Sequence, residues 1–402
     1  MKILMVNKFL YPRGGSESYM LSLGEHLQRM GHDVEYFGMY DDKNTQGNSL
    51  GLYTTNMDFH SKGIHRFLYP FKIIYSFEAR KKIMQVIDDF KPDIVHMNNI
   101  NFQLTPSIIY GIKKKGVPIV QTVHDYQMIC PNHLLYNFDQ NCPCEKCISG
   151  SYINCIKNKC IHGSTVKSVL GVLEAKLYSW LRTYKKVDLF VCPSNFLEKK
   201  LLAAKPYYKG KTITIHNFIN KEKFEASGGN NGDYIVFVGR LSKEKGIEYI
   251  AETARLLPEY TFKIAGNGPD EDILKNIPNI ELAGFLTGES LTDLMKNAKL
   301  LLLPSVCYEN CPLSILEAHS MGVPVVTMNS GGMAELVKDG VTGTLVNDPT
   351  PEAIALKIKE TVENEDYYNS LRENCKNEKD NILSVQAYSD ILIREYERLI
   401  AR

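Results

Sequence analysis

The chain lacks long apolar runs and a strong excess of either charge. None of the apolar runs in its 402 residues approaches the roughly 20 residues of a membrane-spanning helix. The first apolar segment, Lys2–Asn7, is too short for the core of a signal peptide and is typical of a buried strand. The net charge is +1. These absences argue against a membrane-spanning or secreted protein, and we expect a cytoplasmic protein with reduced thiols and two domains.

The basic residues are concentrated in one segment. The segment from Ser151 to Lys211 contains twelve basic and three acidic residues. Within this segment, Val169–Trp180 is amphipathic and holds the only tryptophan of the chain. Basic and aromatic residues together suit an anionic membrane surface or an acidic partner. A core-facing helix with a solvated basic face explains the pattern equally well. Because no nucleic-acid-binding motif accompanies the charge, we expect no nucleic acid partner.

Short apolar strands alternate with helices along the chain, which predicts an α/β fold with two doubly wound parallel sheets. The predicted strands of the first sheet are Lys2–Asn7, Asp33–Gly38, Asp93–Met97, Pro118–Val123 and Asp188–Cys192. Those of the second are Tyr234–Val238, Thr261–Ala265, Asn279–Leu282, Leu300–Leu303 and Val323–Thr327. The clearest predicted helices are Ser16–Met30, Leu68–Phe90 and Thr165–Tyr184.

The most linker-like stretch, Gly228–Gly232, lies near the join of the two predicted domains. We assign residues 1–217 to the first domain and 218–384 to the second. A final helix, residues 385–402, has apolar positions at helical spacing and is expected to cross back to the first domain.

Two carboxylates, Glu309 and Glu317, stand eight positions apart around the predicted start of a helix that follows the strand Leu300–Leu303. Free amides at such a helix start suit an anion such as a diphosphate. The two carboxylates are too far apart to share one proton transfer, so they suit the hydroxyl-bearing ends of an extended ligand. A nucleotide-sugar has that shape. Two solvated glutamates on a helix are the plainer alternative.

Cations follow the first strand of the second domain. Arg240 can bind a phosphate through two parallel hydrogen bonds, and Lys245 can add a second positive charge. In the first domain, Gly14 and Gly15 follow the first strand, either to admit a ligand to the backbone or only to make a turn. His124 ends another strand and either orients a substrate hydroxyl or is structural.

Six of the ten cysteines fall in one segment, about residues 130–162. Cys144 and Cys147, followed by Cys155 and Cys160, have a spacing compatible with a structural zinc site. An iron–sulfur cluster and free thiols are the alternatives.

Together these motifs resemble the retaining glycosyltransferases of family 4, which have the GT-B fold of two Rossmann-like domains facing a central cleft. The resemblance covers nearly the whole chain. It rests on Gly14-Gly15, His124-Asp125, Gly239–Gly246, and Glu309-x7-Glu317 with its Gly-x-Pro-Val-Val and Gly-Gly-x-x-Glu tail.

The resemblance implies a role for each motif. Glu309 would hold hydroxyls of the donor sugar, and Glu317 would bind the ribose of the nucleotide. Arg240 and Lys245 would neutralise the departing diphosphate without a catalytic metal. His124 would lie near the donor sugar and the acceptor. The Gly14-Gly15 loop would lie near the phosphates.

The chain departs from the family pattern after the first glutamate, where Asn310-Cys311-Pro312 replaces Gly-x-Gly. Pro312 has no amide hydrogen, so the amides of Leu313 and Ser314 are the expected phosphate donors. The acceptor is expected to be a sugar or a lipid-linked molecule in cell-surface polysaccharide or glycolipid synthesis, with possible contact to the inner face of a membrane. The alternatives are a silent nucleotide-sugar-binding protein, an epimerase or phosphorylase on the same fold, and a metal or redox protein centred on the cysteines.

Overall fold

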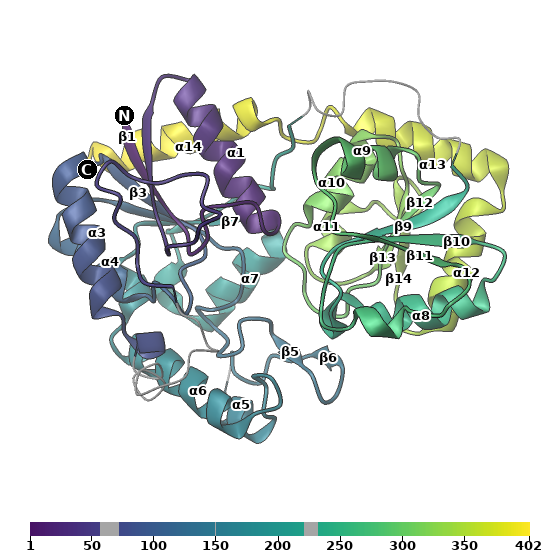
Figure 1. Cartoon of the computed structure of the whole chain (residues 1–402), viewed down its shortest axis with the longest axis horizontal. Helices are drawn as coiled ribbons and strands as arrows, with labels where there is room; N and C mark the ends of the chain where they lie inside the picture. The colour runs from purple at the N-terminus through teal and green to yellow at the C-terminus, as the bar shows by residue number, and fades with distance from the viewer. Residues whose placement is uncertain (57–71, 149, 221–231) are drawn as a thin grey trace. The chain divides into compact units, whose positions relative to one another are not determined.

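The computed structural model describes residues 1–56, 72–148, 150–220 and 232–402, which divide into two compact units. The first unit comprises Met1–Leu135, Cys144–His216 and Val385–Arg402. The second comprises Tyr136–Pro143 and Asn217–Ser384 (Figure 1). Most of the predicted linker Gly228–Gly232 lies outside the described residues.

The first unit is a six-stranded parallel sheet with the strand order β2-β1-β3-β4-β7-β8. Its strands are β1 (Lys2–Val6), β2 (Asp33–Phe37), β3 (Ile94–Met97), β4 (Ile119–Thr122), β7 (Leu189–Cys192) and β8 (Thr212–Thr214). Its helices are α1 (Gly15–Arg29), α3 (Phe77–Phe90), α4 (Ser107–Lys114), α5 (Ile153–Lys157), α6 (Thr165–Trp180), α7 (Asn195–Ala204) and α14 (Val385–Ile400), with 3-10 turns η1 (Thr183–Lys186) and η2 (Pro206–Tyr208).

The second unit has a parallel sheet of the same size, with the strand order β11-β10-β9-β12-β13-β14. Its strands are β9 (Tyr234–Val238), β10 (Thr261–Ala265), β11 (Ile280–Gly284), β12 (Leu300–Leu303), β13 (Val325–Met328) and β14 (Gly343–Val346). Its helices are α8 (Ile247–Leu256), α9 (Gly288–Lys296), α10 (Leu313–Ser320), α11 (Met333–Leu336), α12 (Pro351–Val362) and α13 (Glu365–Glu378), with η4 (Lys243–Lys245) and η5 (Glu271–Ile273). A small antiparallel hairpin, β5 (Tyr136–Asn137) with β6 (Cys142–Pro143), groups with this unit.

The central strands are largely apolar and buried because helices cover both faces of a parallel sheet. All residues of β12 are buried, and so are those of β13. The predicted fold class, two doubly wound α/β units, is therefore confirmed. Among the described residues, no helix is both long and apolar enough to span a membrane.

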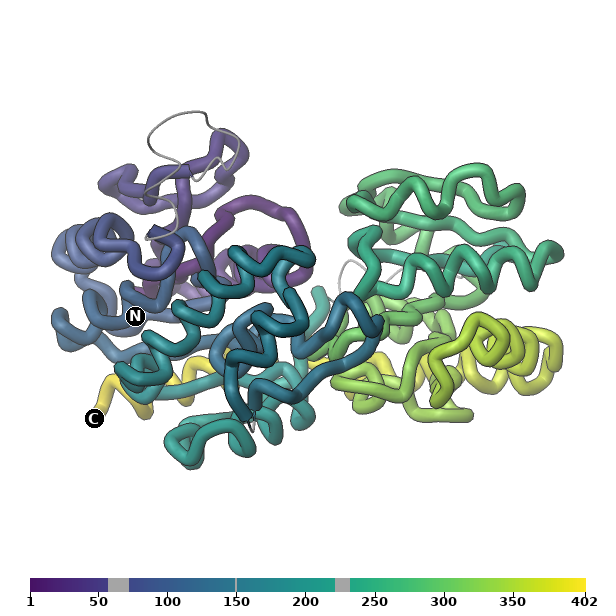
Figure 2. The backbone as a smooth tube through the Cα atoms, turned by 90° about the horizontal axis from the view of Figure 1, so that it is seen from below, coloured from purple at the N-terminus to yellow at the C-terminus, as the bar shows by residue number. Residues whose placement is uncertain are grey.

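The C-terminal helix α14 belongs to the first unit, where it packs against α1. Tyr19 and Tyr388 share a hydrogen bond of 2.6 Å between their hydroxyl groups, and Tyr396 bonds to His96 of β3. Burial lowers the pKa of His96 to about 3, so the ring is neutral at physiological pH. Figure 2 shows this helix, in yellow, lying along the first unit and ending on it.

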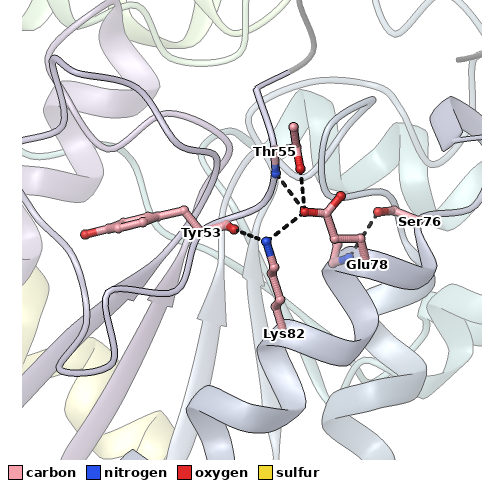
Figure 3. A network of polar contacts seen from close by, with 6 residues as sticks. Tyr53, Thr55, Ser76, Glu78 and Lys82 are labelled. Atoms are coloured by element: carbon pink, nitrogen blue, oxygen red, sulfur yellow. Dashed lines mark hydrogen bonds and ion pairs between the residues drawn. The ribbon is translucent and has the colours of Figure 1, made fainter. Parts of the chain in front are cut away.

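A polar network outside the sheets fixes the start of α3 (Figure 3). Ser76 caps α3 by accepting a hydrogen bond from the amide of Ala79, so this helix begins at Phe77. The sequence pattern predicted a single helix from Leu68 to Phe90. Residues 68–71 of that prediction lie outside the described residues. Glu78 accepts hydrogen bonds from Thr55 and Lys82, and the latter also bonds to the carbonyl of Tyr53 at 2.7 Å. This network ties the segment after β2 to α3.

Candidate functional site

The two central strands of the second unit bring the predicted motifs to one edge of its sheet. Strands β9 and β12 pair in parallel, and the chain leaves β9 toward β10 on its other side (Figure 1). The strand order therefore reverses between β9 and β12. In open α/β sheets, ligands bind at this switch point, beyond the carboxyl ends of the strands. The loop with Arg240 and Lys245 follows β9, and the loop with Glu309 follows β12.

Backbone contacts join these two loops. The carbonyl of Glu244 accepts hydrogen bonds from the amides of Val306 and Cys307, at 3.0 and 3.3 Å. Gly246 has a φ of +79°, and a Cβ there would lie 2.2 Å from the carbonyl oxygen of Pro304. A residue with a side chain would push the loops apart, so glycine is required for this approach.

The side chains of Lys245 and Glu309 form an ion pair across the joined loops. The Glu309 side chain is 14% exposed and that of Lys245 is 27% exposed. Burial opposes the charge of Lys245, but the carboxylate of Glu309, with smaller effects from nearby groups, raises its pKa above the usual value. The lysine is therefore held in its charged form although its side chain is largely shielded from water.

The backbone of Glu309 is held by the glycine turn that follows β13. The carbonyl of Glu309 accepts a hydrogen bond of 2.7 Å from the amide of Gly332. Gly331 has a φ of +61°, and a Cβ on it would come within 2.7 Å of the same carbonyl oxygen. This contact gives the Gly-Gly motif a structural purpose, which is to set the position of the first glutamate.

The helix α10 begins at Leu313, directly after Pro312, which occupies the N-cap position without a side-chain hydrogen bond. The amides of Leu313 and Ser314 have no acceptor within the helix and can therefore bind an anion. Glu317 lies on the second turn of this helix and is partly buried, so only part of the spacing between the two glutamates is helical.

Arg240 follows β9 and is exposed. Its guanidinium forms no ion pair with any other residue that the structure describes. An exposed guanidinium at the carboxyl end of a central strand can bind two phosphate oxygens at once. Arg240 therefore lies at the same end of the sheet as Lys245 and the start of α10.

In the first unit, Gly14 occupies the N-cap position of α1 and Gly15 is the first residue of the helix. The sequence pattern predicted that the helix begins at Ser16, and the hydroxyl of this residue has no capping role in the observed helix. That hydroxyl instead accepts a hydrogen bond of 2.8 Å from Asn99, after β3. The buried Glu17 accepts one from Asn7, at the end of β1. Polar side chains therefore link the ends of adjacent strands at the start of α1.

His124 lies just beyond β4, at the same edge of the first sheet. Its Nε2 atom is 2.9 Å from Oδ1 of Asn98, and its ring packs edge-on against Tyr19 with centroids 5.1 Å apart. Burial lowers the pKa of His124 to about 4, so the imidazole is neutral at physiological pH and can donate or accept a hydrogen bond.

Sequence reasoning missed two residues with evident roles at these edges. Asn98 positions His124 and has a buried amide nitrogen without a partner among the described residues. The position of Asn98 directly after a buried strand is the sequence feature that could have identified it. Glu244 joins the two loops of the second unit through its backbone, and its side chain accepts a hydrogen bond of 2.6 Å from Ser242. No sequence pattern indicates a backbone role.

The predicted zinc site is not supported. Among the described residues, no three His, Cys, Asp or Glu side chains are placed to share a metal ion. Cys147, Cys155 and Cys160 are buried together with Val172, whereas Cys144 is partly exposed and outside this cluster. Burial raises the pKa of Cys147 to about 11, so its thiol is neutral and packs as a small apolar group.

Two family models match the chain and cover both units. The model of "Glycosyltransferase Family 4" matches residues 13–223, more than half of the chain. The model of "Glycosyl transferases group 1" matches residues 219–378.

Individual proteins agree with these matches. An uncharacterised 42.6 kDa protein in the cps region of Klebsiella pneumoniae is 27% identical over 84% of this chain and 87% of its own. Sucrose-phosphate synthase from Thermosynechococcus elongatus has a TM-score of 0.73 at 16% identity, over 100% of this chain and 99% of its own. Anabaena HepE, solved with UDP and glucose, has a TM-score of 0.70 at 18% identity, over 99% of this chain and 100% of its own.

At such low identity the two solved structures establish the fold alone, which is the GT-B arrangement of two Rossmann-like units. The family models carry the assignment further, because one covers the first unit and the other covers the sheet with the paired loops. The chain therefore belongs to Glycosyltransferase Family 4 and is a glycosyltransferase of the GT-B fold.

Proposed function

We propose that the protein transfers a sugar from a nucleoside-diphosphate sugar to an acceptor hydroxyl, with retention of the anomeric configuration. The observation that carries the proposal is the Lys245–Glu309 ion pair between the loops after β9 and β12, at the switch point of the second sheet, where α10 follows Glu309 in the chain. Fixed positive groups there match a diphosphate, and carboxylates match the hydroxyl-bearing ends of a donor.

The second unit would bind the donor. Arg240, Lys245 and the amides of Leu313 and Ser314 would hold the two phosphates. Glu309 would accept hydrogen bonds from hydroxyls of the sugar, and Glu317 from those of the ribose. Anabaena HepE, with its bound UDP and glucose, supports a uridine nucleotide as the first donor to test.

In the reaction, the bond between the anomeric carbon and the β-phosphate oxygen breaks, and the acceptor oxygen bonds to the same face of that carbon. The acceptor proton passes to an oxygen of the departing diphosphate. Because negative charge grows on the diphosphate, Arg240 and Lys245 would stabilise the transition state more than the bound donor. These two cations would do the work for which other enzymes use a divalent metal.

The first unit would serve the acceptor. His124, a neutral imidazole held by Asn98, can hydrogen-bond a sugar hydroxyl without adding charge. The Gly14-Gly15 turn at the start of α1 would lie near the phosphates, where the first backbone amides of the helix can face an anion. The relative in a cps region supports an acceptor in cell-surface polysaccharide or glycolipid synthesis.

A donor panel tests the proposal. Thermal unfolding would be followed with UDP-, GDP-, ADP- and dTDP-sugars, since a ligand that binds only the folded state raises the unfolding temperature. The best donor would then be used in transfer and hydrolysis assays, and NMR of the product would give its anomeric configuration. We expect the same configuration as in the donor. An inverted product would refute the retaining mechanism, and binding without any turnover would favour a silent nucleotide-sugar-binding protein.

Arg240→Ala provides the matched test of the site. We expect turnover to fall about 100-fold, because a group that stabilises the leaving diphosphate is lost. Arg255→Ala is the control, since Arg255 is an exposed arginine of the same unit, on α8, and its side chain is 51% exposed. Equal activity of the two variants would remove Arg240 from the proposed site.

A further inference from the structure

The helix α6 of the first unit has an unusual distribution of side chains. Its buried positions are Ser168, Gly171, Val172, Glu174 and Tyr178, so two of the five are small and one is acidic. Its exposed positions include large apolar side chains: Val166 is 70% exposed, Leu173 49% and Trp180 80%. A helix that only covers the core keeps its large apolar side chains out of water. The exposed apolar groups of α6 are therefore not explained by packing within the unit.

The three exposed apolar residues lie on one face of the helix. They recur every seven positions, which is close to two helical turns, so Val166, Leu173 and Trp180 form a stripe. From Val166 to Trp180 the stripe runs along roughly 21 Å of helix. Figure 1 shows α6 beside α5 at the lower edge of the first unit.

The charge around the stripe is almost entirely positive. Between Ser151 and Lys186 there are seven basic residues and one acidic residue, Glu174, which is buried. Lys167, Lys176 and Arg182 on or next to α6 are exposed. Lys176 is three positions after Leu173 and four before Trp180, so it flanks the stripe directly.

We propose that the α6 surface, defined as Val166, Leu173 and Trp180 with Lys167, Lys176 and Arg182, docks on a membrane that carries anionic lipids. The three apolar side chains enter the boundary between headgroups and acyl chains, where tryptophan is favoured. The long basic side chains reach back to the anionic headgroups while their methylene groups cover apolar surface. This inference goes beyond the proposed function and stands without it.

The charge decides between a membrane and a second copy of the chain. Two copies that met through this surface would place two sets of basic side chains against each other, and like charges oppose association. An anionic lipid surface has the complementary charge. Its attraction for basic groups falls off within a Debye length, so docking should weaken in high salt.

The single tryptophan makes the proposal directly measurable. Trp180 is the only tryptophan of the chain, so its fluorescence reports this surface alone. With vesicles of phosphatidylcholine and phosphatidylglycerol, we expect the emission to shift to shorter wavelength and brominated lipids to quench it. Vesicles of pure phosphatidylcholine should give a much smaller change, and high salt should reduce the change with the anionic vesicles.

Co-sedimentation with the same vesicles tests the residues. Leu173→Ser should lower the partition by about fivefold, and the pair Lys176→Glu and Arg182→Glu by about tenfold or more. Leu356→Ser is the matched control, because Leu356 is 56% exposed on α12 of the second unit. All variants should keep the unfolding temperature of the wild type and its response to UDP, which separates docking from folding and from donor binding.

The proposal would be overturned if anionic vesicles left the emission spectrum of Trp180 unchanged. It would also be overturned if the Leu173→Ser variant sedimented with the vesicles like the wild type. A last contrary result is an emission shift without vesicles that depends on protein concentration and accompanies dimer formation. That result would assign the surface to a second copy of the chain.

Discussion

The ammonium group of Lys245 contacts the carboxylate of Glu309, although the two residues are 64 positions apart in the chain. The contact exists because β9 and β12 are neighbours in the sheet and because the loops after them share backbone hydrogen bonds. A positive and a negative group are thus paired before any ligand arrives. A donor that brings a diphosphate and sugar hydroxyls supplies partners for both.

The ion pair predicts strong coupling between its two members. Lys245→Met and Glu309→Gln should each lower the free energy of unfolding by about 1–3 kcal/mol, because each leaves a largely buried partner unpaired. The double variant should cost less than the sum of the two. Both single variants should lose most transferase activity. Denaturant unfolding of the four proteins measures the coupling, and strictly additive effects would show that the contact contributes nothing to stability.

The glycine turn after β13 predicts a specific effect of Gly331→Ala. Gly288 is the matched control because both glycines have a φ of +61°, but a Cβ on Gly288 would meet nothing within 4 Å. Both variants bear the cost of a left-handed conformation, about 1 kcal/mol. Only Gly331→Ala also displaces the backbone of Glu309, so only it should raise the donor KM. Steady-state kinetics of the two variants decides this, and a similar KM in both would contradict the positioning role.

The buried Glu174 predicts a pH-dependent stability. Burial raises its pKa to about 8, whereas an unfolded glutamate titrates at about 4.3. Between these values the native protein keeps a proton that the unfolded chain has released, so this contribution to stability falls as the pH rises from about 4 to about 8. Glu174→Gln removes the effect and can keep the hydrogen bond to Gln127, which is 3.2 Å long.

We therefore expect the unfolding temperature of Glu174→Gln, relative to the wild type, to increase from pH 5 to pH 8. Glu397→Gln on the exposed face of α14 in the same unit is the control and should show no such trend. A constant difference between Glu174→Gln and the wild type at both pH values would mean that Glu174 is ionised throughout the range.

The packed thiols predict that chelators have little effect. Because Cys147, Cys155 and Cys160 are buried in one apolar cluster and the described residues bring no three potential ligands together, EDTA should leave the unfolding temperature unchanged. Elemental analysis of freshly purified protein should give far less than one zinc per chain. About one equivalent of zinc, together with a lower unfolding temperature in the chelator, would restore the structural zinc site.

Sequence patterns were sufficient to predict the alternation of strands and helices that builds the two sheets. Buried strands such as Leu300–Leu303 and Val325–Met328 are short apolar runs, and helices between them make the sheets parallel. The site motifs could also be located, because ligands bind at the carboxyl ends of the strands and Arg240, Glu309 and His124 each follow a strand.

Tertiary structure decided which of these groups touch. The pairing of Lys245 with Glu309, the contact of Gly331 with the Glu309 backbone and the support of His124 by Asn98 all join segments that are distant in sequence. Cysteine spacing could not show that the thiols pack as apolar groups. Local patterns record the spacing of residues along one element, whereas these contacts depend on strand order and loop conformation, which set the distances between side chains.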